Sequence, residues 1–386
     1  MRIVFYTHMG QLGNGGTESL FGIVKELSKK HDCYVITPYK GDLNYKLSDL
    51  GIQNSILPFK WSSNVNNSLK HKSFKQRIAI IKQWFKRNMF NQKHKRKHVQ
   101  LVKKYQPDII YSNTSVITIG IKVAKELNTP HIWHLREFQD TDITPDFGYR
   151  YLVKYLNKST SIIVNSQLLK TYYEQFINSN KIEVVHNGIA LPVNTKSVLK
   201  NNKDESSYVF LMVGALIPVK GHLEVLKAIK KLKCKNKNFQ LHIVGEGKLR
   251  SQIENYIDIN NLNEQVILHG QHSDVDKFYV NADCYVMCSE SETFGRVTVE
   301  AMLCGLPIIG RNAPYNATKE IIRNEVDGWL YTTTDELVGK MEWMMNNPNL
   351  GIKMGVSAEK WARNNFSLQH SVQQIEEVLL KNVVVK

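Results

Sequence analysis

Short apolar runs alternate with longer amphipathic stretches along most of this chain. Runs such as Arg2 to Tyr6 and Tyr208 to Val213 are rich in aliphatic and aromatic residues, which is typical of buried strands. Stretches such as Thr17 to Lys29 place apolar residues at three- and four-residue spacing, which is typical of helices that cover a sheet. The alternation predicts parallel sheets joined by crossover helices, so we expect an α/β fold.

The same pattern continues in two series with a polar stretch between them. The stretch from Pro192 to Ser207 is rich in Asn, Lys, Asp and Ser, and we interpret it as a linker. A chain of 386 residues also exceeds what one compact core normally holds, so we expect two domains. Further strands are expected at Cys33–Thr37, Asp108–Asn113, His131–Leu135, Ser161–Ser166, Lys181–Asn187, Phe239–Glu246, Gln265–Gly270, Asp283–Cys288, Ile308–Ile309 and Gly328–Tyr331.

Composition places the chain among globular proteins. Hydrophobic residues make up 42%, and no apolar run reaches the ~18 residues of a membrane span. The first residues lead directly into a strand-like run, so we expect no signal peptide. The cysteine count is odd and lacks paired metal-binding spacing, which favours a reducing cytoplasm. The five cysteines are Cys33, Cys234, Cys284, Cys288 and Cys304.

One stretch, Ser289 to Gly310, carries the candidate chemistry. Glu292 is expected in a loop after a buried strand, and Glu300 in the short helix that follows, with seven residues between them. The backbone N–H groups of Phe294 to Thr298 lie at that helix N-terminus, which is a natural seat for an anion. Two carboxylates that can hold sugar hydroxyls beside a phosphate seat indicate a sugar nucleotide. A pair of solvated glutamates on a surface helix is the structural alternative.

The stretch resembles the Glu-x7-Glu signature of the retaining family 4 glycosyltransferases. The resemblance implies the GT-B fold, in which two Rossmann-like doubly wound domains face a central cleft. It implies an N-terminal acceptor-side domain at 1–192, a nucleotide-sugar-binding domain at 193–365, and a helix at 366–386 that returns to the first domain. It also implies that Glu292 meets the donor sugar and Glu300 the ribose. The donor-binding residues carried over here are Phe294, Gly295, Arg296, Val297, Thr298 and Glu300.

Two loops outside the motif extend the resemblance. Gly15 and Gly16 follow the first strand, where family members place a diphosphate loop, although tight turns also use such glycine pairs for steric reasons. Lys220 matches a lysine that contacts the donor diphosphate, while Ala215 stands where the family usually has an arginine. Arg296 is a candidate replacement for that missing cation. A solvated lysine at a helix start is the structural alternative for Lys220.

A histidine completes the predicted site. His134 and Arg136 are expected at or just past the carboxyl end of a strand, where open α/β sheets bind ligands. The resemblance implies that His134 contacts the donor sugar as a catalytic residue together with Glu292. A structural histidine is the alternative, and Arg136 and Glu137 could simply pair with each other.

The predicted activity is transfer of a hexose or N-acetylhexosamine from a nucleotide sugar, most simply a UDP-sugar. The acceptor implied is a hydroxyl of a lipid-linked or polymeric glycan in surface-polysaccharide synthesis. No metal and no cofactor are expected, because neither Asp140–Asp142 nor Asp274–Asp276 follows a convincing strand. A nucleotide-sugar-modifying NAD enzyme is one alternative, although the glycines do not spell G-x-G-x-x-G. A nucleic-acid-binding protein is the other.

The net charge of +16 is concentrated in residues 70–104, which contain no Asp or Glu. With thirteen basic residues there, the rest of the chain carries only +3. Ile78, Ile81, Phe85 and Met89 recur at helical spacing within it, with Ile80 and Trp84 nearby. A basic amphipathic helix predicts docking on an anionic membrane, hence a peripheral protein on the cytoplasmic face and no nucleic-acid partner. The alternative is a crossover helix whose apolar stripe packs on the first domain.

Overall fold

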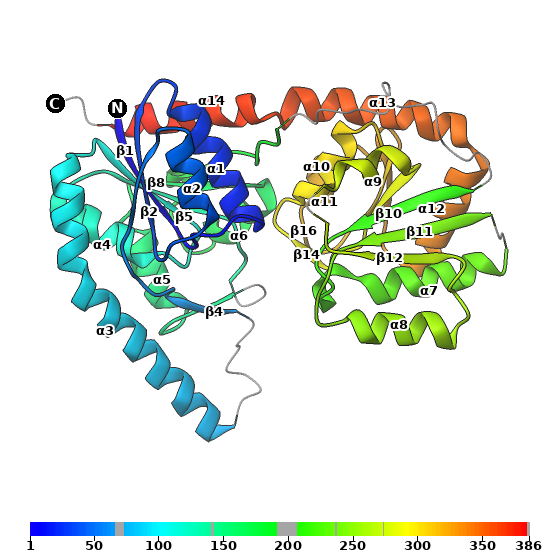
Figure 1. The fold of residues 1–386 in the computed structure, drawn as a ribbon, viewed down its shortest axis with the longest axis horizontal. Coiled ribbons are helices and arrows are strands. Elements are labelled where there is room, and N and C mark those ends of the chain that lie inside the picture. The colour runs from blue at the N-terminus through cyan, green and yellow to red at the C-terminus, as the bar shows by residue number, and fades with distance from the viewer. Residues whose placement is uncertain (66–72, 140–142, 191–206, 236–237, 273, 384–386) are drawn as a thin grey trace. The chain divides into compact units, whose positions relative to one another are not determined.

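The computed structural model describes residues 1–65, 73–139, 143–190, 207–235, 238–272 and 274–383 (Figure 1). Lys70, Lys72 and the Asp140–Asp142 pair therefore lie outside the described residues. The predicted linker also lies outside them, except for Ser207. The chain divides into two compact units. Unit 1 comprises Met1–Gly188 with Leu368–Lys386, and unit 2 comprises Ile189–Ser367.

Unit 1 is built on a parallel sheet of seven strands in the order β3-β2-β1-β5-β6-β8-β9. Alternate residues of each strand face opposite layers of helices, so Ile3 and Phe5 pack in one layer and Val4 and Tyr6 in the other. A separate antiparallel pair, β4 and β7, lies outside this sheet. The strands are β1 Arg2–Thr7, β2 Asp32–Thr37, β3 Gln53–Ile56, β4 Ser63–Val65, β5 Ile109–Asn113, β6 His131–Leu135, β7 Ile143–Pro145, β8 Ser161–Val164 and β9 Ile182–Val184.

Helices cover both faces of this sheet. The helices α1, α2 and α14 share one apolar cluster with the sheet, while α3 to α6 contribute to the clusters on the other face. The C-terminal helix α14 buries Ile375 and Leu379 in the α1 cluster, which is why it belongs to unit 1. The helices are α1 Gly15–Leu27, α2 Asp42–Asp49, α3 Phe74–Tyr105, α4 Thr118–Leu127, α5 Tyr149–Leu156, α6 Gln167–Glu174 and α14 Leu368–Asn382.

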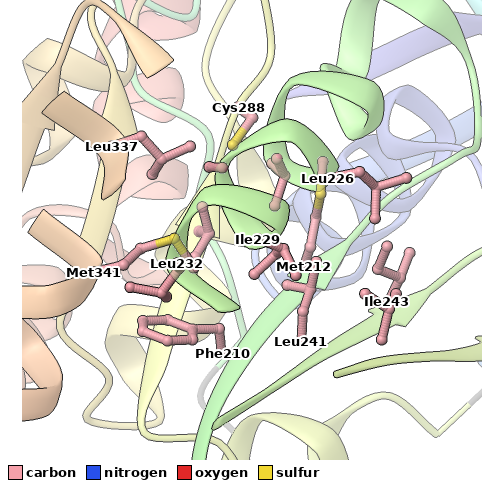
Figure 2. Close-up of a cluster of buried hydrophobic side chains, with 14 of the residues drawn as sticks. Phe210, Met212, Leu226, Ile229, Leu232, Leu241, Ile243, Cys288, Leu337 and Met341 are labelled. Carbon is pink, nitrogen blue, oxygen red and sulfur yellow. The ribbon is translucent and has the colours of Figure 1, made fainter. Parts of the chain in front are cut away.

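Unit 2 repeats the design with six parallel strands in the order β12-β11-β10-β13-β15-β17. Figure 2 shows part of the core between this sheet and α7 and α12, where Phe210 lies near Leu232 and Met341. The strands are β10 Tyr208–Val213, β11 Phe239–Val244, β12 Val266–Gly270, β13 Cys284–Met287, β15 Ile308–Arg311 and β17 Gly328–Tyr331. The helices are α7 His222–Lys233, α8 Arg250–Ile259, α9 Asp276–Asn281, α10 Arg296–Leu303, α11 Thr318–Ile321, α12 Thr334–Asn346 and α13 Pro348–Asn365.

Each sheet reverses its strand order beside its first strand. In unit 1 the reversal lies between β1 and β5, and in unit 2 between β10 and β13. At such a switch point the loops leave in opposite directions, and open α/β sheets bind ligands in the crevice outside the carboxyl ends of these strands. The loops that follow β1, β5, β10 and β13 are therefore where candidate residues are sought.

Several predicted boundaries shift by a few residues. The first helix begins at Gly15 rather than Thr17, because Asn14 caps it and accepts from the backbone N–H of Gly16 at 2.9 Å. The glycine pair is thus the first turn of α1 and not a loop before it. Glu292 likewise lies in a two-residue strand, β14 Ser291–Glu292, which pairs with β16 Tyr315–Asn316.

Candidate active site

The first carboxylate of the motif bridges the switch point of unit 2. Glu292 Oε2 accepts from Lys220 Nζ at 2.5 Å, which brings together groups that are 72 residues apart in sequence. Lys220 follows β10 and Glu292 follows β13, the two strands between which the order reverses. The β14–β16 pairing holds the Glu292 backbone, and Ala317 N–H donates to its carbonyl at 2.8 Å. A cation and a carboxylate are thus fixed where a ligand is expected.

The second carboxylate is oriented by two neighbours. Tyr279 OH donates to Glu300 Oε2 at 3.2 Å, and Arg296 Nη2 lies 3.6 Å from Glu300 Oε1. Burial, and then the nearby Glu300, hold the pKa of Tyr279 well above its usual value, so the phenol keeps its proton and donates. Glu300 retains 29% of its side-chain exposure and is therefore reachable by a ligand.

The start of α10 is close to Glu292 because it begins at a glycine. Gly295 has φ +85°, and a Cβ there would meet Glu292 Cγ at 3.3 Å and Thr298 Oγ1 at 3.2 Å. Any other residue would be strained at this φ and would push the carboxylate away. The backbone N–H groups of the first turn of α10 therefore lie beside the sugar-binding candidate.

Two of the predicted donor-binding side chains are core residues. Phe294 is 2% exposed and packs against the ring of Phe366, with 5.7 Å between ring centroids, and Thr298 is fully buried. The Thr298 N–H donates to Gly295 O at 3.0 Å, so the predicted anion seat has one N–H group fewer than expected. These two residues can meet a ligand only through their backbone, while Val297 is partly buried beside them.

A second glycine contact fixes the Lys220 loop. Gly221 has φ +75°, and a Cβ at this position would lie 2.2 Å from the carbonyl oxygen of Cys288. The loop after β10 can therefore touch the end of β13 only because residue 221 is glycine. Ala215, at the start of the same loop, is exposed and supplies no cation.

His134 lies near the carboxyl end of its strand, where it is buried. It lies within β6, which continues to Leu135, and it is 1% exposed. The Tyr111 hydroxyl and Arg136 Nη2 both lie at His134 Nδ1, so Nδ1 is an acceptor and Nε2 carries the hydrogen. Burial and the Arg136 charge hold the pKa of His134 well below its usual value. The His134 imidazole is therefore neutral and buried, and it accepts a hydrogen bond from Arg136.

The suggested Arg136–Glu137 side-chain pairing is not what orders these residues. The Arg136 guanidinium donates to Asn113 Oδ1 at 2.8 Å and to the side chain of Asn187. Glu137 instead accepts from the backbone N–H and the hydroxyl of Ser115, at 3.1 and 2.9 Å. Both side chains thereby tie together loops at the carboxyl edge of the first sheet.

Sequence reasoning missed two residues at the switch point of unit 1. His8 directly follows β1 and Thr114 directly follows β5, and both flank Gly16 at the start of α1. Neither belongs to a recognisable motif. Their position after the two strands beside the reversal is the one signal that could have identified them, and it requires the strand order.

Within the described part of the chain, no group of three or more His, Cys, Asp or Glu side chains is arranged to hold a metal ion. None of the helices there combines the length and the apolar character that crossing a bilayer requires.

Models of known protein families match the sequence of both units. A model of Glycosyltransferase Family 4 matches residues 13–191, and a model of Glycosyl transferases group 1 matches residues 194–361. The chain belongs to this glycosyltransferase family. The first match contains the Gly15–Gly16 turn and the second contains Lys220, Glu292 and Glu300, so the transferase carries its candidate residues inside the matched regions.

The sequence identity between this chain and individual relatives is low. An uncharacterised glycosyltransferase of Methanocaldococcus jannaschii is 29% identical over 265 residues, 67% of this chain and 71% of that protein. The capsular polysaccharide biosynthesis glycosyltransferase CapM of Staphylococcus aureus is 28% identical over 255 residues, 60% of this chain and 66% of CapM. The transferase also resembles the crystal structure of Anabaena HepE in complex with UDP, with a TM-score of 0.79, 21% identity and coverage of 99% and 100%. That likeness establishes the GT-B fold.

We expect replacement of Lys220 by alanine to weaken nucleoside diphosphate binding by about tenfold or more, since a hydrogen bond to a charged group contributes about 1.5–3 kcal/mol. The loss should exceed the usual one for this family, because Ala215 leaves no second cation in the same loop. Calorimetric titration with UDP, GDP and ADP measures it. Lys230→Ala, which removes an exposed lysine from the last turn of α7, is the matched control. Equal affinity in all three proteins would show that Lys220 does not contact the nucleoside diphosphate.

Proposed function

We propose that this transferase moves a hexose or N-acetylhexosamine from a UDP-sugar, with retention, to a hydroxyl of a lipid-linked or polymeric glycan in surface-polysaccharide synthesis. The observation that carries the donor side is the Lys220–Glu292 pair across the switch point, with Glu300 one helix away. UDP in the HepE structure supports the choice of base, and the role of CapM in capsule synthesis supports the pathway class. Family membership favours this function over the NAD enzyme and the nucleic-acid-binding alternatives.

In this mechanism the protein stabilises charge rather than forming a covalent bond. The transition state resembles an oxocarbenium ion, and negative charge develops on the departing diphosphate. Lys220 and the first turn of α10 are proposed to stabilise that charge, with Arg296 as a further cation, and the Gly15–Gly16 turn of unit 1 is a separate candidate for binding a diphosphate. One helix terminus contributes about 0.3–2 kcal/mol, so several groups must act together.

Glu292 is proposed to orient the donor sugar through its hydroxyls, and Glu300 to hold the ribose while Tyr279 fixes its second oxygen. Because Glu292 already accepts a hydrogen bond from Lys220, sugar and diphosphate recognition are coupled in one ion pair. A sugar contact by His134 remains part of the proposal. The imidazole would act there as a neutral hydrogen-bond donor through Nε2.

Screening for donor hydrolysis tests the proposal directly. We expect slow, acceptor-independent release of nucleoside diphosphate from one member of a panel of UDP-, GDP- and ADP-sugars. Retention is checked by the anomer of the sugar first released, observed by proton NMR. Hydrolysis of none of the panel, combined with reduction of NAD on a nucleotide sugar, would contradict the assignment.

Transfer is expected to persist in EDTA, because Lys220, Arg296 and the α10 terminus can supply the positive charge that a divalent metal would otherwise provide. Asp274 and Asp276 follow β12, the edge strand of the unit 2 sheet, rather than β10 or β13. The measurement is the transfer rate with EDTA, with and without added Mn²⁺. Loss of activity in chelator with recovery in Mn²⁺ would refute metal independence.

We also propose that α3 docks the transferase on an anionic membrane surface. Ile78, Ile81, Phe85 and Met89 are 38%, 39%, 54% and 69% exposed, so this stripe is only partly covered by the first domain, where Phe85 meets the ring of Phe147. With Phe74 they form one narrow apolar line along the outer face, bordered by lysines. Figure 1 shows the N-terminal part of α3 extending past the sheet of its own unit.

The opposite face of α3 packs against the rest of unit 1. Ile80 and Trp84 are buried, and Arg87 donates to Asp146 and, at 2.8 Å, to Asn64 Oδ1. Asn91 brackets Lys60 with two hydrogen bonds, at 2.7 and 2.8 Å. Because this face already anchors the helix on unit 1, the exposed part of the stripe is available for a further contact, and its basic flanks support the choice of anionic lipid.

A further inference from the structure

Two buried polar atoms at the switch point of unit 1 lack hydrogen-bond partners among the described residues. They are His8 Nδ1 and Thr114 Oγ1, in side chains that are 6% and 3% exposed. Buried polar atoms are normally hydrogen-bonded, and leaving one unpaired costs about 1–3 kcal/mol. Two such atoms on the strands that flank a strand-order reversal indicate a site for a polar ligand.

Carbon atoms of both side chains lie close to Gly16. A Cβ built on Gly16 would lie 3.2 Å from His8 Cε1 and 3.6 Å from Thr114 Cγ2. Gly16 is in the first turn of α1, so both side chains lie at the start of that helix. A side chain at position 16 would press on the imidazole edge, so the close approach of His8 to the start of α1 depends on this glycine.

Thr114 is held in an unfavourable backbone conformation at this place. Its φ is +90°, a region that a β-branched residue rarely adopts and that costs about 1–3 kcal/mol. Its N–H donates to His134 O at 2.8 Å, and its carbonyl accepts from the Trp133 indole at 2.7 Å. A residue keeps such a strained conformation only when surrounding contacts hold it, and strained residues are common at binding sites. Thr114 is held in this conformation beside His8 and Gly16.

The imidazole of His8 is neutral. Burial, and then the Arg136 charge, lower its pKa to about 4, although a hydrogen bond with Asn14 opposes the shift. A neutral imidazole nitrogen and a threonine hydroxyl suit a hydroxyl group, which both donates and accepts, better than they suit a fully charged anion.

The aromatic ring of Trp61 lies beside the His8 imidazole. The Trp61 ring centroid lies 5.6 Å from that of His8, and the indole N–H donates to His8 O at 2.7 Å. Trp61 is only partly buried. The hydrogen bonds between Asn91 of α3 and the backbone of Lys60 fix the residue before it. An indole face next to convergent polar groups is typical of sites that hold an amphipathic ring such as a sugar.

We propose that His8, Thr114 and Trp61 form a saccharide subsite in unit 1 that binds the glycan acceptor. His8 Nδ1 and Thr114 Oγ1 hold sugar hydroxyls, and the Trp61 ring covers an apolar sugar face. This deepens the proposed function, on which it rests, by assigning the acceptor as a glycoside and naming the side chains that select it.

Saturation-transfer difference NMR with a panel of methyl hexosides and methyl N-acetylhexosaminides tests the subsite on the full chain. We expect binding by the wild type and a loss of about tenfold in affinity for His8→Gln, Thr114→Val and Trp61→Ala. His8→Asn, which retains a polar atom near Nδ1, and Thr114→Ser, which retains the hydroxyl, should keep most of the binding. His131→Gln is the matched control, because His131 is equally buried but both its ring nitrogens are hydrogen-bonded, to Ser112 and Ser159.

Two results with the glycoside panel would overturn the subsite. One is a wild type that binds no glycoside of the panel, and the other is equal binding by His8→Gln, Thr114→Val and the wild type. Phosphorus NMR with inorganic phosphate tests whether the site binds phosphate oxygens rather than sugar hydroxyls. Phosphate binding that disappears in the same variants would assign the site to the donor diphosphate instead. UDP-, GDP- and ADP-sugar hydrolysis is measured in parallel. Normal hydrolysis with a failed subsite leaves the proposed function standing, whereas its absence in the wild type counts against that function.

Discussion

Replacing Glu292 or Glu300 by glutamine is expected to lower kcat/KM for transfer by about 10- to 150-fold while leaving the fold intact. Each carboxylate makes charge-assisted hydrogen bonds, worth about 1.5–3 kcal/mol apiece, and glutamine keeps the shape but not the charge. In Glu292→Gln, Lys220 also loses its 2.5 Å ion-pair partner, so the loss should appear in both kcat and KM. In Glu300→Gln, Tyr279 keeps an oxygen acceptor, so the effect should fall mainly on nucleotide binding.

Glu290→Gln is the control for this pair. Glu290 lies two residues before Glu292, its side chain is 64% exposed, and its Oε1 lies 3.5 Å from Arg311 Nη1. We expect it to keep transfer within about twofold of the wild type, since exposed ion pairs contribute about 0–1 kcal/mol. Circular dichroism and thermal unfolding confirm that all variants are folded. Turnover at the wild-type rate by both Glu292→Gln and Glu300→Gln would refute the site.

The second large effect is expected in membrane binding. Each basic residue near an anionic leaflet contributes about 1 kcal/mol, so engaging a third of the thirteen in residues 70–104 gives roughly 4 kcal/mol, on the order of a thousandfold in partitioning. Wild type should co-sediment with phosphatidylglycerol vesicles at low salt and largely dissociate at high salt, because salt screens the attraction. It should ignore phosphatidylcholine vesicles under both conditions.

The structure identifies which basic residues to change. Arg87 and Lys95 pair with Asp146 and Glu126, so they serve the fold. Lys82, Lys86 and Lys93 are exposed beside the apolar stripe, and their replacement by Glu should abolish sedimentation. The matched control places the same three reversals in unit 2, at the exposed residues Lys230, Lys353 and Lys360, and should bind as the wild type does.

The apolar stripe makes a separate contribution. Serine at Ile81, Phe85 and Met89 should weaken vesicle binding without changing its salt dependence, because these side chains add buried apolar area rather than charge. Wild type that does not sediment with phosphatidylglycerol vesicles at low salt would refute membrane docking. Equal loss in the α3 variant and in the unit 2 control would assign the effect to net charge alone.

Much of the fold is determined locally and could be predicted from the sequence. The runs Arg2–Tyr6 and Tyr208–Val213 are continuous apolar segments bounded by turn residues, and both are central strands because only a doubly covered strand needs apolar residues on both faces. The motif around Glu292 and Glu300 can likewise be recognised from the sequence, because its strand, turn and helix are contiguous in the chain. Helix starts were harder, and α1 begins at a glycine pair because of the Asn14 cap.

What the sequence alone could not determine depends on contacts between distant segments. Lys220 and Glu292 meet only because β10 and β13 are neighbours in the sheet. Apolar residues occur on two sides of α3, and tertiary packing decides that Ile80 and Trp84 are buried while Phe85 and Met89 stay exposed. His134 looked available at a strand end but is enclosed, whereas His8 belongs to no motif and lies at the switch point. Local pattern thus determined the elements and the motif, and strand order, which no local pattern encodes, decided which side chains converge.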